Sequence, residues 1–204
     1  MNYETGILQN LGTWGDVRLS YFLYDIDDYI ATSSWNVSNI PGATGLYTYN
    51  LDNVKIQGFE VEGNFNLTSN LSGYANYLYQ DNDTSGEMPD MPPNFLALFA
   101  ENQFNLGVRY KAFEEYKFLR DMLLHADVRY VGTRESKAGF TVDDFTVVNV
   151  GFEVDLGLGS RVAQELQPKL SFWINNLFDE DYEEVYGFPM PGINVGGGIK
   201  LTLW

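Results

Sequence analysis

Apolar and polar residues alternate along several short stretches of the chain, and turn-forming residues separate these stretches from one another. Strict alternation is the pattern of a β-strand with one apolar face. In Asp16 to Asp25, for example, Val17, Leu19, Tyr21 and Leu23 share one side of the strand. The pattern predicts about nine strands, over Tyr3 to Leu11, Asp16 to Asp25, Val54 to Leu67, Leu71 to Gln80, Phe95 to Phe104, Leu124 to Tyr130, Thr146 to Leu156, Leu170 to Asn175 and Ile193 to Leu203.

The faces opposite the apolar ones are charged or amide-bearing. In Val54 to Leu67, the residues Phe59 and Val61 alternate with Glu60 and Glu62. A barrel that spans a membrane around a wet lumen needs this arrangement, with apolar residues outward and polar residues inward. If the strands form such a barrel, we expect these residues to line its lumen: Glu60, Glu62, Asp127, Arg129, Glu153 and Asp155.

The composition is consistent with a sheet protein at a membrane. Aromatic residues make up 16% of the chain, and aromatic residues are favoured in strands. A mean hydropathy of −0.22 does not exclude a barrel, because only alternate residues of its strands meet lipid. The net charge of −16 argues against nucleic acid as a partner, since a phosphate backbone attracts basic surfaces.

The segment before the last predicted strand carries a distinctive motif. It contains N-L-F-D-x-x-Y from Asn176 to Tyr182 and G-x-P-x-P-G from Gly187 to Gly192, and the chain ends on Trp204. Together with the G-x-E segment inside Asn53 to Phe65, this motif resembles the C-terminal β-barrel portion of TonB-dependent outer-membrane receptors.

The resemblance implies an all-β fold, an antiparallel up-and-down transmembrane β-barrel of which residues 1–204 form the C-terminal part, with the plug domain absent. It implies location in the bacterial outer membrane and uptake of a bulky, scarce nutrient such as a ferric siderophore or cobalamin. The implied partners are outer-membrane lipid and lipopolysaccharide, a small-molecule ligand, and TonB and a plug domain through the missing N-terminal part. It implies neither enzymatic activity nor a cofactor.

The connections between the predicted strands support this interpretation. Gly12 to Gly15 is a short turn, whereas Asp27 to Asn53 and Asp81 to Asn94 are long. Short periplasmic turns and long outer loops are typical of outer-membrane barrels. Leu106 to Asp121 and Gly157 to Lys169 do not fit this alternation. The former could be a helical turn or two or a strand extension, and we interpret it as a longer periplasmic connection.

No constellation of a nucleophile and a base, no zinc spacing and no phosphate-binding loop occurs in the sequence. We therefore predict no catalytic, cofactor-binding or metal-binding residues. His125, Asp127 and Arg129 share a strand face and could form a proton relay or an ordinary polar ladder. The acidic cluster Asp179 to Glu184 could hold a cation or be solvated.

Aromatic residues of the long loops are the candidate ligand contacts, because flat amphipathic rings bind bulky ligands at a modest entropy cost. The alternative is an aromatic girdle at the lipid interface. The candidates are Trp35, Tyr47, Tyr49, Tyr182, Tyr186 and Phe188.

Two other functions are compatible with the pattern. The first is a small self-contained outer-membrane barrel with an adhesin or structural role, which requires an even number of strands. The second is a soluble β-sandwich that binds carbohydrate. The sandwich predicts that the face carrying Val148, Val150, Phe152 and Val154 packs in a dry core, whereas the barrel predicts that this face meets lipid.

Overall fold

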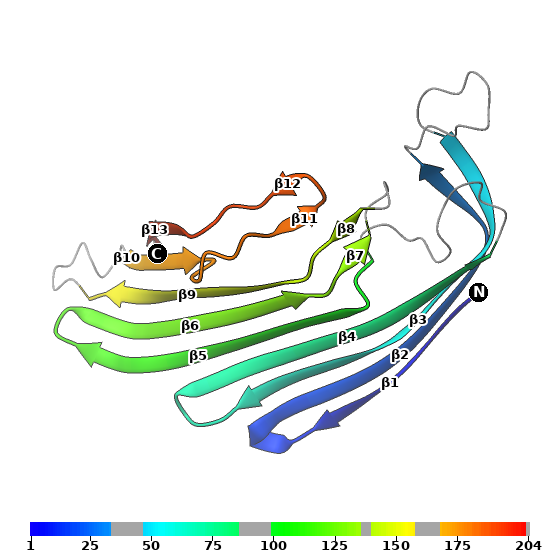
Figure 1. The fold of residues 1–204 in the computed structure, drawn as a ribbon. Helices are drawn as coiled ribbons and strands as arrows, with labels where there is room; N and C mark the ends of the chain where they lie inside the picture. The colour runs from blue at the N-terminus through cyan, green and yellow to red at the C-terminus, as the bar shows by residue number, and fades with distance from the viewer. Residues whose placement is uncertain (34–46, 86–98, 136–139, 158–167, 203–204) are drawn as a thin grey trace.

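A computed structural model describes residues 1–33, 47–85, 99–135, 140–157 and 168–202. Its main element is one antiparallel sheet of nine strands in the order β1-β2-β3-β4-β5-β6-β9-β10-β13 (Figure 1). The strands are β1 (Asn2–Asn10), β2 (Gly15–Ser33), β3 (Tyr47–Asn66), β4 (Leu71–Ser85), β5 (Asn102–Tyr116), β6 (Leu119–Val131), β9 (Phe145–Leu156), β10 (Pro168–Asn175) and β13 (Asn194–Leu201). Two small ribbons pair β7 (Arg134–Glu135) with β8 (Thr141–Val142) and β11 (Glu183–Val185) with β12 (Phe188–Pro189). No helix in these ranges is long and apolar enough to cross a membrane.

The register gives the sheet one apolar and one polar face. Across five strands, one row of paired residues consists of Leu19, Val61, Tyr77, Phe104 and Tyr130. The adjacent row, which points to the opposite face, consists of Arg18, Glu62, Asn76, Asn105 and Arg129. The six residues expected to line a lumen all fall on this polar face, because strand residues two apart share a face.

The apolar face is exposed along the sheet. Leu19 is 48% exposed, Leu106 46% and Ile199 71%. In the described residues the sheet is a single curved layer, and no second sheet covers this face (Figure 1). The alternative of a β-sandwich is therefore wrong for the described residues. Val148, Val150 and Phe152 are only partly buried, and although Val154 is 4% exposed, no second sheet packs on this face.

The sheet is open at both edges. Among the described residues, β1 pairs only with β2 and β13 pairs only with β10. The two termini belong to these opposite edges (Figure 1). The prediction of about nine antiparallel strands that do not close by themselves is confirmed.

The interpretation of Leu106 to Asp121 as a periplasmic connection is wrong, and the alternative of a strand extension is the one the structure shows. These residues form most of β5, a tight turn at Lys117 and Phe118, and the start of β6. The predicted strand Phe95 to Phe104 is correspondingly misplaced, since β5 begins at Asn102 and residues 95–98 lie outside the described ranges. The physical reason is a β-bulge in each strand, because a bulge adds a residue and shifts the alternation by one position.

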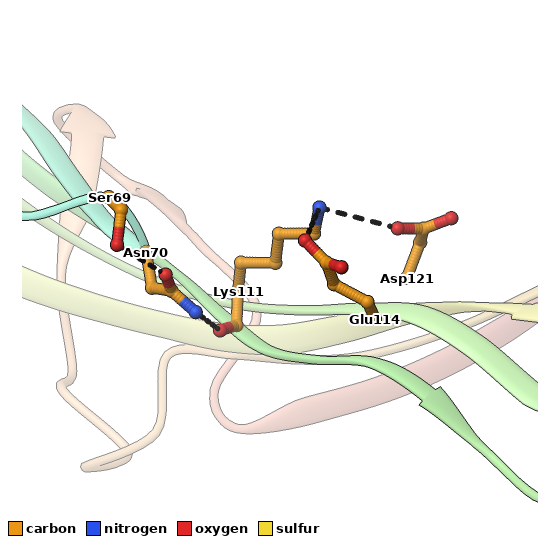
Figure 2. Close-up of polar contacts among 5 residues, drawn as sticks. All are labelled: Ser69, Asn70, Lys111, Glu114 and Asp121. Carbon is orange, nitrogen blue, oxygen red and sulfur yellow. Dashed lines mark hydrogen bonds and ion pairs between the residues drawn. The ribbon is translucent and has the colours of Figure 1, made fainter.

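Polar contacts hold the bulged hairpin together (Figure 2). The Lys111 ammonium lies 3.3 Å from a Glu114 carboxylate oxygen and 3.5 Å from one of Asp121. The Asn70 side-chain amide donates to the Lys111 carbonyl at 3.1 Å, and the Ser69 hydroxyl donates to the Asn70 side-chain oxygen at 2.7 Å. The short turn before β4 is therefore tied to the point where β5 bulges.

The long connection predicted from Asp27 to Asn53 is also shorter than expected. Strands β2 and β3 continue as a paired ribbon from Asp27 opposite Asn53 to Ser33 opposite Tyr47, and β4 likewise continues through residues 81–85. Alternation fails there because the backbone hydrogen bonds of a paired ribbon form whatever its side chains are. Its side chains differ in burial, since Ile30 is 70% exposed and Leu51 is 1% exposed.

Among the described residues, a cluster of buried hydrophobic side chains lies near one end of the sheet, which we call the long-loop end because the connections β2–β3, β4–β5 and β10–β13 lie there. Ala100, Val131, Phe145 and Val147 are buried together, and Tyr182 packs against them. The predicted strand Thr146 to Leu156 is confirmed as β9, with Phe145 as its first residue. This cluster determines where the last long connection sits.

Candidate functional site

The connection between β10 and β13, residues 176–193, folds over the polar face of the sheet, and we call it the strap. In Figure 1 the strap's β11–β12 ribbon lies above β6 and β9 and beside β7–β8, and β11 contacts β8. The strap contains the sequence motif described above. The geometry of the motif can therefore be described residue by residue from the strap.

Asn176 ties both ends of the strap together. Its side-chain amide donates to the carbonyls of Glu180 at 2.8 Å and Pro191 at 3.3 Å, and its side-chain oxygen accepts the Glu180 amide at 2.8 Å. Its own backbone amide donates to the Asn149 side-chain oxygen at 3.0 Å. Asn176 is 2% exposed and has a φ of 51°, a left-handed conformation that asparagine tolerates better than most residues.

Asp179 closes the strap a second time. Its φ is 56°, and its carboxylate accepts the backbone amide of Ile193 at 2.7 Å. Gly192 lies so close to this carboxylate that a β-carbon at that position would overlap it. The N-L-F-D and P-G parts of the motif therefore meet in space as the two ends of one closed loop.

Tyr182 anchors the middle of the strap to the sheet. Its ring lies 4.4 Å from the ring of Phe145, centroid to centroid, at an interplanar angle of 39°. Its carbonyl accepts the Met190 amide at 2.9 Å. Burial raises the pKa of the Tyr182 phenol, and the nearby Glu184 carboxylate raises it further.

Two arginines reach the strap from the sheet side. Arg129 forms an ion pair with Glu184 at 2.7 Å, and Arg134 donates to the Glu183 carbonyl at 2.8 Å. Both guanidinium groups lie over the Phe145 ring, at 5.5 and 5.2 Å from its centroid, where cation–π attraction is favourable. Burial lowers the pKa of Arg134, Glu184 opposes this effect and Arg129 reinforces it.

The six candidate aromatic residues do not form one cluster. Tyr186 stacks on Phe140 at 4.4 Å and 7°, and it remains 45% exposed, while Phe188 is 70% exposed. Tyr47 and Tyr49 belong to β3, where they pair with Ser33 and Ala31. Trp35 lies outside the described residues. Tyr182, Tyr186 and Phe188 share the strap, but Tyr182 packs on Phe145 and Tyr186 on Phe140. Ligand contact by any of the six remains a prediction.

Sequence reasoning missed Phe145, Arg134 and the role of Asn176. A signal for Phe145 was available, because Phe145 and Val147 occupy polar-face positions of β9. An apolar pair on the polar face indicates that something covers it. For Asn176 no comparable signal exists, since its partners lie on three separate segments.

The other candidate groups have structural partners. The Asp127 carboxylate accepts a hydrogen bond from the Tyr74 hydroxyl at 2.8 Å, and Arg129 pairs with Glu184. Across the described ranges no hydrogen bond joins His125 to Asp127, so the polar-ladder interpretation is the one the geometry supports. In the same ranges no group of three or more His, Cys, Asp or Glu residues is arranged to hold a metal ion; Asp179 instead caps Ile193, and Glu183 accepts the Gly187 amide at 2.7 Å.

A small recess opens on the polar face beside the strap. Its volume is about 270 Å³. Apart from Val147, Tyr182 and Pro191, the lining consists of one arginine and four side-chain amides: Arg129, Asn149, Asn175, Asn176 and Asn194. It is a concave polar surface next to the anchored aromatic ring of the strap.

Comparison with known proteins identifies relatives of this fold. A family model described as TonB dependent receptor-like, beta-barrel matches residues 1–177. The copper transporter OprC is similar with a TM-score of 0.70 and 18% identity, over 97% of this chain and 30% of its own. The FrpB iron transporter from Neisseria meningitidis (F3-3 variant) gives 0.67 and 18%, over 97% and 30%, and the FpvAI–pyocin S2 complex gives 0.66 and 18%, over 95% and 26%.

At these identities the structural similarity shows the fold alone. The chain spans less than a third of the length of the solved chains it resembles. No curated protein matches the sequence.

Proposed function

The chain belongs to the TonB dependent receptor-like β-barrel family, and from this membership we propose that it forms the C-terminal part of a receptor that takes up a bulky, scarce nutrient. Members of this family are transporters of the bacterial outer membrane and not enzymes, so the chain belongs in that membrane. The cargo we propose is a metal-containing chelate such as a ferric siderophore, or a comparable ligand such as cobalamin. The description of the relatives OprC and FrpB as copper and iron transporters supports a metal-containing cargo.

The observation that carries this proposal is the two-faced, open sheet. One continuous face is apolar and exposed, as a wall in contact with lipid must be, and the other carries charged and amide side chains, as a wet lumen requires. Bacterial single-chain barrels have even strand numbers. The described residues form a sheet of nine strands whose two edges are unpaired, which supports a piece of a larger barrel over a self-contained one.

In this proposal the strap and the β2–β3 ribbon form part of the outer entrance for the ligand. Tyr186 and Phe188 stay exposed and serve as ligand contacts, together with Trp35, Tyr47 and Tyr49 on the β2–β3 side. Tyr182 has the different task of holding the strap in place. A plug domain and the contact to TonB come from another part of the receptor, while outer-membrane lipid and lipopolysaccharide surround the apolar face.

The test compares ligand uptake by cells that have the receptor with uptake by cells in which its gene is deleted. Cells in which the receptor is deleted should lose accumulation of one member of a panel of radiolabelled ferric siderophores and cobalamin. Complementation should restore it, and an uncoupler of the proton gradient should abolish it again. If the deletion leaves uptake of every panel member unchanged while the receptor is abundant in the outer membrane, uptake of this cargo class is not its function.

A further inference from the structure

The recess beside the strap is small and fixed. Its volume of about 270 Å³ lies below the roughly 300 to 1,000 Å³ of a pocket for a whole drug-sized ligand. It is therefore of a size to take one chemical group of a larger molecule. Its walls come from β6, β9, β10, β13 and the strap, so the strap completes it.

The orientation of each amide in the recess follows from the backbone groups around it. The Asn149 side-chain oxygen accepts the Asn176 backbone N–H at 3.0 Å, so the side-chain NH₂ of Asn149 is left to donate elsewhere. The Asn194 NH₂ donates to the Gly192 carbonyl at 3.1 Å, so its oxygen accepts the Asn175 NH₂ at 3.0 Å. The oxygen of Asn175 is thereby presented as an acceptor.

These amides retain hydrogen-bonding capacity after their internal contacts are made. A carboxamide has two donor hydrogens and an oxygen with two lone pairs. Among the described residues, no hydrogen bond occupies the NH₂ of Asn149 or the oxygen of Asn175. The recess thus offers a donor from β9 and an acceptor from β10, each held by an internal bond, and such preorganisation favours binding.

The charges around the recess favour a neutral group. Arg129 is the only charged residue that lines it, and its guanidinium is already paired with Glu184 at 2.7 Å. An anionic group would compete with Glu184 for Arg129 and meet the acidic strap. A cationic group would lie against Arg129. A neutral group that donates and accepts meets neither cost.

We infer that this recess is a subsite for one uncharged group of a ligand that both donates and accepts hydrogen bonds, either an amide or a pair of sugar hydroxyls, bound between Asn149 and Asn175 beside the Tyr182 ring. The assignment rests on the uptake function proposed above, since a ligand must pass this wall.

The test is calorimetric titration of the full receptor in detergent with four probes. N,N′-diacetylchitobiose carries amides and hydroxyls, cellobiose carries hydroxyls alone, and citrate and spermidine supply the anionic and cationic alternatives. Asn149→Asp keeps the oxygen that caps Asn176 and removes the donor. Asn175→Ala removes the acceptor together with the hydrogen bond to Asn194, but it removes no hydrogen bond made by residues 176–193 themselves. Asn76→Ala, on the polar face of β4 and away from the recess lining, is the matched control.

We expect at least one neutral disaccharide to bind the wild-type receptor, and Asn149→Asp and Asn175→Ala each to weaken binding roughly three- to tenfold, the equivalent of one hydrogen bond. Asn76→Ala should bind as the wild type does. Binding of diacetylchitobiose but not cellobiose assigns the group as an amide, and equal binding of both assigns it as hydroxyls. If Asn149→Asp opens the strap, as hydrogen exchange of residues 176–193 would reveal, Asn175→Ala decides the result.

The inference is overturned if neither disaccharide binds, if the two variants bind them like the wild type, or if citrate or spermidine is the probe that depends on these residues. It is also overturned if another segment of the full receptor fills the recess in its structure. Failure of the uptake test alone would leave the titration result standing, and loss of the titration result would leave the uptake test unaffected.

Discussion

The long-loop end contains two extensions that are built in different ways. The β2–β3 ribbon is held by its backbone ladder and by exposed amide contacts, such as the Asn50 NH₂ donating to Asp28 at 3.2 Å. Ile30 on it is 70% exposed, although Leu51 is 1% exposed. The strap has little regular structure, yet Phe145 beneath it and Asn176 at its root are each 2% exposed.

The difference shows what each kind of segment requires. A hairpin satisfies its backbone groups by itself, so its side chains are free to be polar and exposed. A loop that lies against a wall has to obtain its hydrogen bonds from side chains, and here buried rings add packing that holds the loop in place. Substitutions should therefore have large effects in and beneath the strap and small effects at the exposed positions of the β2–β3 ribbon, such as Ile30 and Asn50.

Phe145→Ala should give the largest effect. The ring contacts Tyr182 and lies beneath the guanidinium groups of Arg129 and Arg134, and removal of a buried phenylalanine costs about 3–5 kcal/mol. Native-state hydrogen exchange of β7 and β11 should detect local opening of about that size. Ile30→Ala in the β2–β3 ribbon should change exchange by less than about 0.5 kcal/mol, and equal effects of the two substitutions would refute the comparison.

Asn176→Ala should have the second-largest effect on the stability of the strap. It leaves the Glu180 amide and the Glu180 and Pro191 carbonyls without their side-chain partner, and a buried polar group without a partner costs about 1–3 kcal/mol. Limited proteolysis should cut the strap in this variant and spare it in the wild type. Asn50→Ala, which removes one exposed contact of the ribbon, is the control, and a strap as resistant in Asn176→Ala as in the wild type would show that Asn176 does not hold it.

Tyr186→Ala should destabilise the strap less than Asn176→Ala does. Its ring stacks on Phe140, but both rings are about half exposed, at 45% and 50%, and such aromatic pairs contribute about 0.5–1.5 kcal/mol. A double-mutant cycle with Phe140→Ala, followed by exchange of β8 and β11, would measure the coupling. A coupling energy near zero would mean that the stack does not join the two ribbons.

Glu184→Gln should have the smallest effect. The Arg129–Glu184 pair is short at 2.7 Å, but its side chains are 46% and 40% exposed, and solvent screening limits such pairs to about 0–1 kcal/mol. Strap exchange should accelerate slightly at low salt and match the wild type at high salt. A salt-independent loss larger than that of Asn176→Ala would reverse the proposed order of contributions.

Much of the wall was predictable from local sequence. The alternation in Asp16 to Asp25 and Thr146 to Leu156 identified two strands and their outward faces, and the residues expected to line the lumen share the polar face. The prediction failed at Leu106 to Asp121, where bulges shift the alternation, and in Asp27 to Asn53, where a paired ribbon continues without regular alternation in the sequence. Of the candidate aromatics, Tyr182 is an anchor, and only its packing against Phe145 reveals this.

The sequence by itself determined that this protein is a sheet with one lipid-compatible face, because a strand's alternation is a property of neighbouring residues and needs no knowledge of partners. Tertiary structure alone decided that Asn176 and Asp179 close the strap, that Phe145 and two arginines hold it down, and that four asparagines meet beside it. These contacts join segments far apart in the chain, and they exist only once the register of β6, β9, β10 and β13 is set.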